Sequence, residues 1–217
     1  MENIFSIEGK KIIITGACGG LGRGVARGLK EAGAIVCAMD YSDKLDEIVK
    51  NDSLDYAVKV NLMDRKDLNR AFDEALEKLD GQIDVLLNFA GIQKRYPCEE
   101  FPIEEWDKVI EVNLTAVFEM SKLAGNYMLK QGHGKIVNVA SMLSYFGGKN
   151  VPAYTASKGG VMQLTKALAV AWADRNVQVN AVAPGYMATE MNTALMQDPV
   201  RSSEIEKRIP AKRWGNG

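Results

Sequence analysis

Short apolar or β-branched runs alternate with amphipathic stretches along the whole chain, and this alternation limits the fold more than any other feature. Each run is dominated by apolar or β-branched residues, as expected for a buried strand. Strands are expected at 11–14, 34–39, 56–60, 83–87, 135–139 and 177–182, and helices at 20–31, 43–50, 65–79, 103–130 and 154–175. The pattern predicts an α/β fold, a Rossmann-like doubly wound parallel sheet flanked by helices on both faces.

The chain is expected to form one domain over residues 1–217. It has 217 residues, 47% of them hydrophobic, which is enough for one sizeable core, and no repeat or linker divides it. Methionines and leucine lie among polar residues in the segment 186–208. This segment is predicted to form short helices that act as a mobile substrate lid, and the alternative is a helix pair packed on the core.

Charge and targeting features favour small-molecule chemistry. The formal net charge is -1 and no long basic run is present, which argues against nucleic acid or an anionic membrane as partner. The first residues hold no long apolar stretch, so a cytoplasmic location is expected. Three cysteines without metal-site spacing predict free thiols and no metal. His133, the single histidine, is interpreted as a loop residue without a carboxylate partner.

A glycine-rich segment, TGACGGLG, follows the first expected strand and opens the first expected helix. Glycine lets the backbone approach a pyrophosphate closely, and the helix start offers free N–H groups to the phosphate charge. The residues expected to bind a dinucleotide here are Gly16, Gly19, Gly20, Leu21 and Gly22.

An aspartate at the end of the second strand supports the same interpretation. Asp40 lies about 20 residues beyond the glycines, where a carboxylate accepts hydrogen bonds from the adenosine ribose. A carboxylate at this position repels a 2′-phosphate, and neither Met39 nor Tyr41 supplies a cation. NAD is therefore predicted rather than NADP, with Lys44 as the nearest cation that could favour NADP.

Tyr154 and Lys158 are four residues apart at the start of the last long helix, so they share one helix face. A nearby ammonium favours the phenolate, which makes Tyr154 a candidate general acid/base. Ser141, after the preceding strand, is predicted to hydrogen-bond the substrate oxygen. Such a pattern on its own also occurs by chance in helices, and the order Ser, Tyr, Lys is what favours a catalytic role.

Together these motifs resemble the classical short-chain dehydrogenase/reductase family over nearly the whole chain. The family's TGxxxGxG is matched by Thr15, Gly16, Gly20 and Gly22, although Gly19 also fits the TGxxGxxG of its extended branch. The later matches, which favour the classical branch, are Asn88, Ala90 and Gly91 for NNAG, Pro184, Gly185 and Thr189 for PGxxxT, and Asn113, Ser141, Tyr154 and Lys158 for the catalytic tetrad.

The resemblance implies roles for several of these residues. Lys158 is expected to bind the nicotinamide ribose and to lower the tyrosine pKa, Asn113 to help a water-linked proton relay, and Thr189 to contact the carboxamide. Two departures are mild: Phe89 replaces the second asparagine of NNAG, and Asn61 replaces a frequent aspartate near the adenine. The cofactor-binding residues implied in addition to the glycine loop are Asp40, Asn61, Leu62, Asn88, Ala90, Gly91, Tyr154, Lys158, Pro184, Gly185 and Thr189.

The resemblance also bears on the end of the chain and on assembly. Members of the family continue through another helix and a last strand beyond the point that corresponds to Gly217, so the sequence is interpreted as truncated. A homo-oligomer, tetramer or dimer, is expected from the family, through helix pairing at 103–130 and 154–175.

Within the family, the sequences after the fifth and sixth strands resemble dehydrogenases of sugar acids such as 2-deoxy-D-gluconate or 2-dehydro-3-deoxy-D-gluconate. Lys94 and Arg95 follow the fourth strand and are predicted to bind the substrate carboxylate beside Ser141 and Tyr154, although two exposed cations on a loop are the simpler interpretation. A 3-oxoacyl-thioester reductase or another hydroxyl dehydrogenase is the alternative enzyme. A dinucleotide-binding protein without turnover is the alternative of another class.

Overall fold

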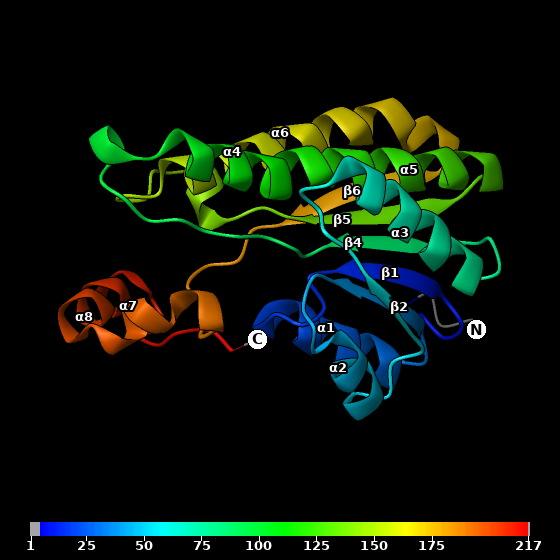
Figure 1. Cartoon of the computed structure of the whole chain (residues 1–217), viewed down its shortest axis with the longest axis horizontal. Helices are drawn as coiled ribbons and strands as arrows, with labels where there is room; N and C mark the ends of the chain where they lie inside the picture. The colour runs from blue at the N-terminus through cyan, green and yellow to red at the C-terminus, as the bar shows by residue number, and fades with distance from the viewer. Residues whose placement is uncertain (1–4, 217) are drawn as a thin grey trace.

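The computed structural model describes residues 5–216 and contains one six-stranded parallel sheet. Its strands lie in the order β3-β2-β1-β4-β5-β6, and helices cover both faces (Figure 1). The prediction of a doubly wound Rossmann-like fold is thereby confirmed. The strands are β1 (Lys11–Thr15), β2 (Ile35–Asp40), β3 (Tyr56–Lys59), β4 (Val85–Asn88), β5 (Gly134–Val139) and β6 (Val177–Val182).

The strand order reverses between β1 and β4, and this reversal determines where a ligand can bind. From β1 the chain continues outward through β2 and β3, and then returns to place β4 on the other side of β1. The helices after β1 and after β4 consequently lie on opposite faces and leave a crevice above the carboxyl ends of the strands. Thr15 and Asn88 pair in register at this end of the sheet.

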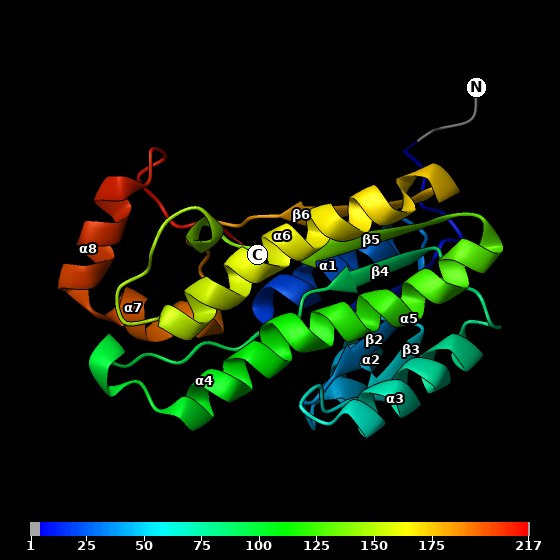
Figure 2. The ribbon, with the colours of Figure 1, turned by 90° about the horizontal axis from the view of Figure 1, so that it is seen from above.

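Helices α1 and α2 cover one face of the sheet, and α3, α5 and α6 cover the other (Figures 1 and 2). Alternate residues of β1 point to opposite faces of the sheet. Ile13 therefore packs in the core beneath α3, α5 and α6, and Ile12 packs in the core beneath α1 and α2. The helices are α1 (Gly20–Glu31), α2 (Leu45–Asn51), α3 (Arg65–Lys78), α4 (Ile103–Ile110), α5 (Ala116–Gln131), α6 (Pro152–Trp172), α7 (Thr193–Gln197) and α8 (Pro199–Arg208).

Two helices differ from the sequence-based expectation. The helix predicted over 103–130 is divided into α4 and α5 by a π-helical turn, η2 (Glu111–Thr115). The helix predicted to begin at Tyr154 begins at Pro152 instead, because proline is well suited to the first turn, where its missing N–H has no helical partner. Both differences lie beside the candidate active site.

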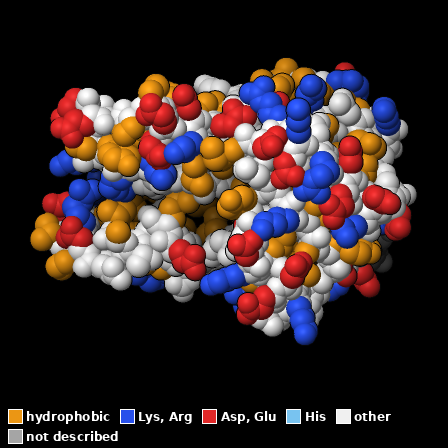
Figure 3. Space-filling view, in the orientation of Figure 1, with side chains coloured by type: hydrophobic (Ala, Val, Ile, Leu, Met, Phe, Trp, Pro, Cys, Tyr) orange, Lys and Arg blue, Asp and Glu red, His pale blue; other side chains and the backbone are white. Residues whose placement is uncertain are grey.

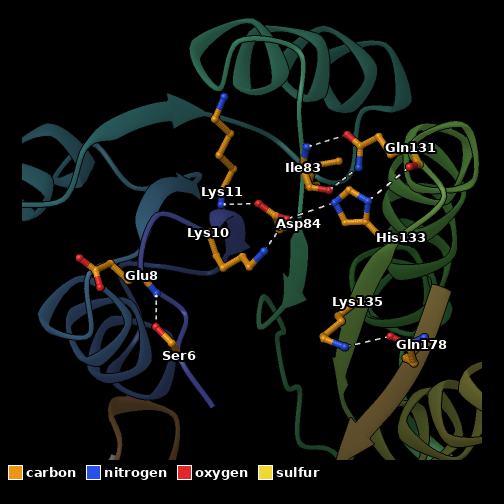
Figure 4. Close-up of polar contacts among 10 residues, drawn as sticks. All are labelled: Ser6, Glu8, Lys10, Lys11, Ile83, Asp84, Gln131, His133, Lys135 and Gln178. Atoms are coloured by element: carbon orange, nitrogen blue, oxygen red, sulfur yellow. Dashed lines mark hydrogen bonds and ion pairs between the residues drawn. The ribbon is translucent and has the colours of Figure 1, made fainter. Parts of the chain in front are cut away.

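Asp84 anchors the amino ends of the strands, at the end of the sheet away from the crevice (Figure 4). Its carboxylate accepts the Lys11 N–H at 2.9 Å, and Lys10 Nζ and His133 Nε2 both lie 3.4 Å from it. The sequence-based expectation that His133 has no carboxylate partner is therefore wrong. Asp84 and His133 precede the neighbouring strands β4 and β5, and the pairing of these strands brings the two residues together.

Helices α7 and α8 project beyond the carboxyl ends of the strands, beside the amino end of α6 (Figures 1 and 2). The segment that carries them returns to its own start, since Gly215 donates its N–H to the Tyr186 carbonyl at 2.9 Å and accepts from Ala188 at 2.8 Å. The Tyr186 and Trp214 rings pack edge to face, 5.5 Å apart. Among the residues described, no helix has the length and apolar character to cross a membrane.

Candidate active site

A cavity of about 1000 Å³ lies over the carboxyl ends of the strands, at the reversal of strand order. Figure 3 shows the surface hollowed between the body of the molecule and the projecting α7 and α8. The predicted residues that line it are Gly16, Gly19, Gly20, Leu21, Gly22, Asp40, Asn61, Leu62, Ala90, Gly91, Ser141, Tyr154, Lys158, Pro184, Gly185 and Thr189.

The glycine loop between β1 and α1 needs glycine for two steric reasons. Gly16 has a φ of +73°, and a Cβ there would lie 2.6 Å from the backbone nitrogen of Ala90. A Cβ on Gly22 would lie 2.1 Å from the carbonyl oxygen of Gly16. The start of α1 therefore approaches the loop closely, and its first residues line the cavity, as phosphate binding by a helix N-terminus requires.

Asp40 at the end of β2 fixes this loop from the other side. Its Oδ2 accepts the Cys18 N–H and its Oδ1 accepts the Ser42 N–H, each at 2.9 Å. Burial and the neighbouring carboxylate raise the pKa of the Cys18 thiol to about 12, so this side chain stays neutral. Asp40 lines the cavity, and each of its oxygens can accept a further hydrogen bond.

Asn88 is one predicted cofactor residue that does not reach the cavity. It is buried below it, where its Nδ2 donates to Ser121 Oγ at 3.1 Å and to Asn138 Oδ1 at 2.9 Å. Asn138 in turn donates to Thr165 Oγ1 at 3.0 Å. This chain of hydrogen bonds joins β4 and β5 to α5 and α6, so Asn88 supports the site from beneath.

Tyr154 and Lys158 face one another from successive turns of α6. Lys158 Nζ lies 5.7 Å from the centre of the Tyr154 ring and donates to the Val139 carbonyl at 2.6 Å. Lys158 is only 3% exposed, and burial lowers the pKa of its ammonium to about 8. Burial also raises the pKa of the Tyr154 phenol, while a hydrogen bond with Ser141 lowers it. Without further positive charge in the site, the phenol is therefore neutral.

Ser141 begins a short 3₁₀ turn, η3 (Met142–Ser144), and is held by a reciprocal cap. Its Oγ accepts the Leu143 N–H at 3.1 Å, and Ser144 Oγ accepts the Ser141 N–H at 3.2 Å. Ser144 also donates to the Lys158 carbonyl at 2.7 Å. This last bond connects the serine turn to α6 and fixes Ser141 relative to Tyr154. Ser144 was not among the site residues predicted from the sequence.

Asn113 lies in the π-helical turn η2 and is fully buried. Its side chain exchanges two hydrogen bonds with the Ile92 backbone, at 2.8 and 2.9 Å, and donates to Ser157 Oγ at 3.2 Å. Asn113 does not line the cavity, but it lies next to residues that do. A Cβ added to Gly91, in the cavity wall, would lie 3.5 Å from Asn113 Oδ1 and 3.7 Å from Lys158 Nζ. A π-turn widens the helix locally and often occurs at functional sites.

We expect Asn113→Ala to destabilise the protein and to loosen the segment after β4. The change leaves the Ile92 N–H and carbonyl without their partners in a half-buried position, which costs about 1–3 kcal/mol for each unsatisfied group. The loss in the free energy of unfolding is measured by denaturant unfolding, provided that its slope against denaturant concentration is the same for the variant and the wild type. Asn126→Ala, at an exposed position of α5, is the matched control. Equal stability of the two variants would contradict the role of Asn113 as a clamp.

The lowered pKa of Lys158 predicts a pH dependence of stability. Between about pH 8 and 10 the unfolded chain keeps a proton on this lysine that the folded protein has released, so the free energy of unfolding rises with pH. For a shift from 10.5 to about 8, the rise is ~2 kcal/mol across this window. The difference between the wild type and Lys158→Met, unfolded in denaturant at each pH, isolates this contribution. A constant difference would contradict it.

A second, smaller cavity of about 100 Å³ adjoins the first, and Ser141 and Tyr154 line both. Arg95 lines it, as the sequence suggested, and donates to the Lys149 carbonyl at 3.2 Å. Lys94 lines neither cavity. Its Nζ lies 2.9 Å from Glu105 Oε2, so it already has a carboxylate partner and is left out of the candidate substrate site.

Several lining residues of the second cavity were not found from the sequence. Gln93 precedes the two cations, Asn192 lies in a 3₁₀ turn before α7, and Arg201 lies on α8. Gln93 closely follows the motif that ends at Gly91, so its position beside the site could have been inferred. Nothing in the local sequence distinguishes Arg201 from the other charged residues of a polar helix.

Comparison with known proteins agrees with this geometry. The short chain dehydrogenase family matches residues 10–200. The chain is 42% identical to the 2-dehydro-3-deoxy-D-gluconate 5-dehydrogenase of Bacillus subtilis strain 168 over 217 residues, which are 99% of this chain and 85% of the relative. It is 40% identical to the 5-keto-D-gluconate 5-reductase of Escherichia coli strain K12 over 221 residues, covering 100% of this chain and 87% of that enzyme.

A solved structure shares the fold closely. The gluconate 5-dehydrogenase of Burkholderia cenocepacia J2315, in complex with NADP and tartrate, superimposes with a TM-score of 0.90 at 36% identity, over 97% of this chain and 84% of that one. The glycine loop, the Ser-Tyr-Lys arrangement and these matches lead to one conclusion: the chain belongs to the short-chain dehydrogenase family.

Proposed function

We propose that the protein is an NAD-dependent dehydrogenase that transfers a hydride between the cofactor and a hydroxyl or keto carbon of a sugar acid. One observation carries the proposal. Tyr154 and Ser141 line the boundary between a cavity large enough for a dinucleotide and a smaller cavity with cationic walls. A substrate in the smaller cavity would place its reacting carbon beside both the phenol and the cofactor.

The residues of the larger cavity fit a nicotinamide dinucleotide. The glycine loop would hold the pyrophosphate, because Gly16 and Gly22 leave no room for a Cβ and the start of α1 supplies N–H donors. Asp40 would accept from the adenosine ribose, and Lys158 would donate to the nicotinamide ribose. When bound, the nicotinamide supplies the hydride acceptor or donor.

The chain's own residues supply the proton chemistry. In oxidation, Tyr154 as phenolate accepts the proton of the substrate hydroxyl, and in reduction it returns this proton. The Lys158 ammonium, 5.7 Å from the centre of the Tyr154 ring, would favour the phenolate, and a hydrogen bond with Ser141 lowers the pKa of the phenol. Ser141 also positions the substrate oxygen, since its cap and Ser144 fix it relative to α6. The relay through Asn113 stays a prediction.

The preference for NAD over NADP is supported by the charges at the adenosine end of the cavity. Asp40 places a carboxylate there, and the arginine on that wall, Arg23, is already paired with Asp52 at 2.5 and 2.9 Å. Lys44 is exposed on the same wall and is the cation that could favour a 2′-phosphate. The relative from Burkholderia cenocepacia is described with NADP, so the preference has to be measured directly.

A sugar acid as substrate is supported by the relatives and by the second cavity. Two relatives are named for oxidation or reduction at C5 of hexonic acids, and the solved relative is described with tartrate, a small hydroxy acid. In the second cavity Arg95 supplies a guanidinium for a carboxylate. Gln93 and Asn192 supply amide groups for hydroxyls. Coverage by the segment 186–208, a homo-oligomer and a cytoplasmic location stay predictions.

The proposal is tested by following the absorbance of the reduced cofactor. The purified protein is mixed with NAD or NADP and with 2-deoxy-D-gluconate, D-gluconate or a simple alcohol, and in the reverse direction with NADH and a 3-oxoacyl thioester. We expect NAD reduction with at least one sugar acid and little turnover of the other two classes. Efficient reduction of the thioester without turnover of any sugar acid would overturn the substrate assignment.

A further inference from the structure

The second cavity is lined by three cationic residues and, within the described part of the chain, by no acidic one. Arg95, Lys149 and Arg201 all line it, and none of its lining residues between positions 5 and 216 is an aspartate or glutamate. The three cations come from separate parts of the chain, namely the loop after β4, the loop before α6, and α8. Cations that converge on a cavity without a counter-ion are unfavourable unless an anion binds there.

Arg201 is the member of this group that earlier observations do not explain. It lies in the first turn of α8, with about a third of its side chain exposed. Its nearest carboxylate is Glu204, whose Oε2 lies 3.9 Å from Nε, too far for a hydrogen bond, and whose own side chain is 65% exposed. The guanidinium is therefore available for another anion.

Arg95 and Arg201 are close enough to affect one another. Loss of hydration lowers the pKa of Arg95, and the positive charge of Arg201 lowers it further. Both residues line the cavity that Tyr154 and Ser141 also line. A carboxylate between the two guanidinium groups would relieve this repulsion and accept hydrogen bonds from both.

We infer that Arg201 of α8 binds the substrate carboxylate together with Arg95, and so determines specificity for acids over neutral polyols. The inference rests on the proposed function, because it names the group that recognises the acid end of the substrate. Arg201 belongs to the segment that carries α7 and α8, whereas Arg95 follows a central strand. A carboxylate therefore connects the projecting segment to the body of the molecule, and a neutral polyol does not.

The test compares two ligands that differ only in the charged group. D-Gluconate and D-glucitol share the carbon skeleton, and the alcohol has CH₂OH in place of the carboxylate. Binding of each to the protein loaded with NADH is measured by calorimetry, since no oxidation can occur under these conditions. The variants are Arg201→Gln and Arg201→Lys, with Arg208→Gln as the matched control, because Arg208 lies on the same helix and lines neither cavity.

We expect the wild type to bind D-gluconate more tightly than D-glucitol. Arg201→Gln should weaken D-gluconate binding by about 10- to 100-fold and leave D-glucitol binding unchanged, because the lost interaction is a charge-assisted hydrogen bond. Arg201→Lys should restore part of the affinity, since it keeps the charge but not the two-pronged geometry. Arg208→Gln should behave like the wild type.

Three results would overturn the inference: unchanged D-gluconate affinity in Arg201→Gln, an equal loss for both ligands, or no binding of D-gluconate by the wild type. The test also separates this inference from the proposed function. If the wild type oxidises sugar acids and Arg201→Gln does so with the same KM, the function stands and the role of Arg201 falls. If no sugar acid is oxidised but D-gluconate binding depends on Arg201, the proposed reaction falls and only the binding of acids by Arg201 stands.

Discussion

Replacing Tyr154 with phenylalanine is expected to lower kcat for the sugar acid by about 100- to 10,000-fold, the contribution of a positioned general acid/base. The change removes one oxygen from a half-buried side chain and keeps the ring against which Lys158 packs. The glycine loop and Asp40 are untouched, so NAD affinity should stay within about twofold. Turnover is measured from the absorbance of the reduced cofactor, and affinity from the quenching of protein fluorescence.

A matched control for this variant is Tyr145→Phe. Tyr145 follows the Ser141 turn, is 72% exposed and lines neither cavity, so loss of its hydroxyl should leave kcat unchanged. Two results would contradict the assignment of Tyr154. One is a kcat within a few-fold of the wild type. The other is a loss of NAD affinity as large as the loss of kcat, which would indicate a binding role instead of proton transfer.

The larger part of this fold could be predicted because its signals are local. The boundaries of α1 and β6 agree with the sequence-based ranges, since a glycine loop begins the first and a β-branched run defines the second. The division between α4 and α5 was not predicted. A π-turn adds one residue to a helical turn, and over so few residues it does not change the spacing of hydrophobic residues. Its cause is tertiary: Asn113 turns inward to reach the Ile92 backbone.

The residues of the candidate site likewise could be predicted where the signal is local and could not where it depends on the tertiary structure. The lining by the glycines and Asp40 could be predicted because motifs fix these residues relative to strand ends. The buried place of Asn88 could not, since only the assembled sheet shows that its side chain points to α5. Arg201 was missed for a further reason. It is about 100 residues from Arg95 in the sequence, and the placement of α8 beyond the strand ends has no sequence signature.

The second large effect concerns cofactor choice. We expect Asp40→Asn to weaken NAD binding about 10-fold and to strengthen NADP binding about 10-fold, so that the preference for NAD changes by roughly 100-fold. Asparagine has nearly the same size but no charge, so the stronger hydrogen bonds to the ribose are lost and repulsion of a 2′-phosphate ends. Dissociation constants for both cofactors, measured by fluorescence titration, check the ratio.

Asp40 has two roles, and the ratio of the NAD and NADP dissociation constants separates them. Its carboxylate also holds the Cys18 and Ser42 N–H groups, and a looser glycine loop would weaken both cofactors alike and leave the ratio unchanged. Asp43→Asn is the matched control, because Asp43, in the turn after β2, pairs with Lys59 at the end of β3 and does not line the cavity. A ratio that moves only in Asp40→Asn supports charge discrimination. A ratio that stays constant while both affinities fall assigns Asp40 to loop geometry, and NAD preference would then need another source, such as the position of Lys44.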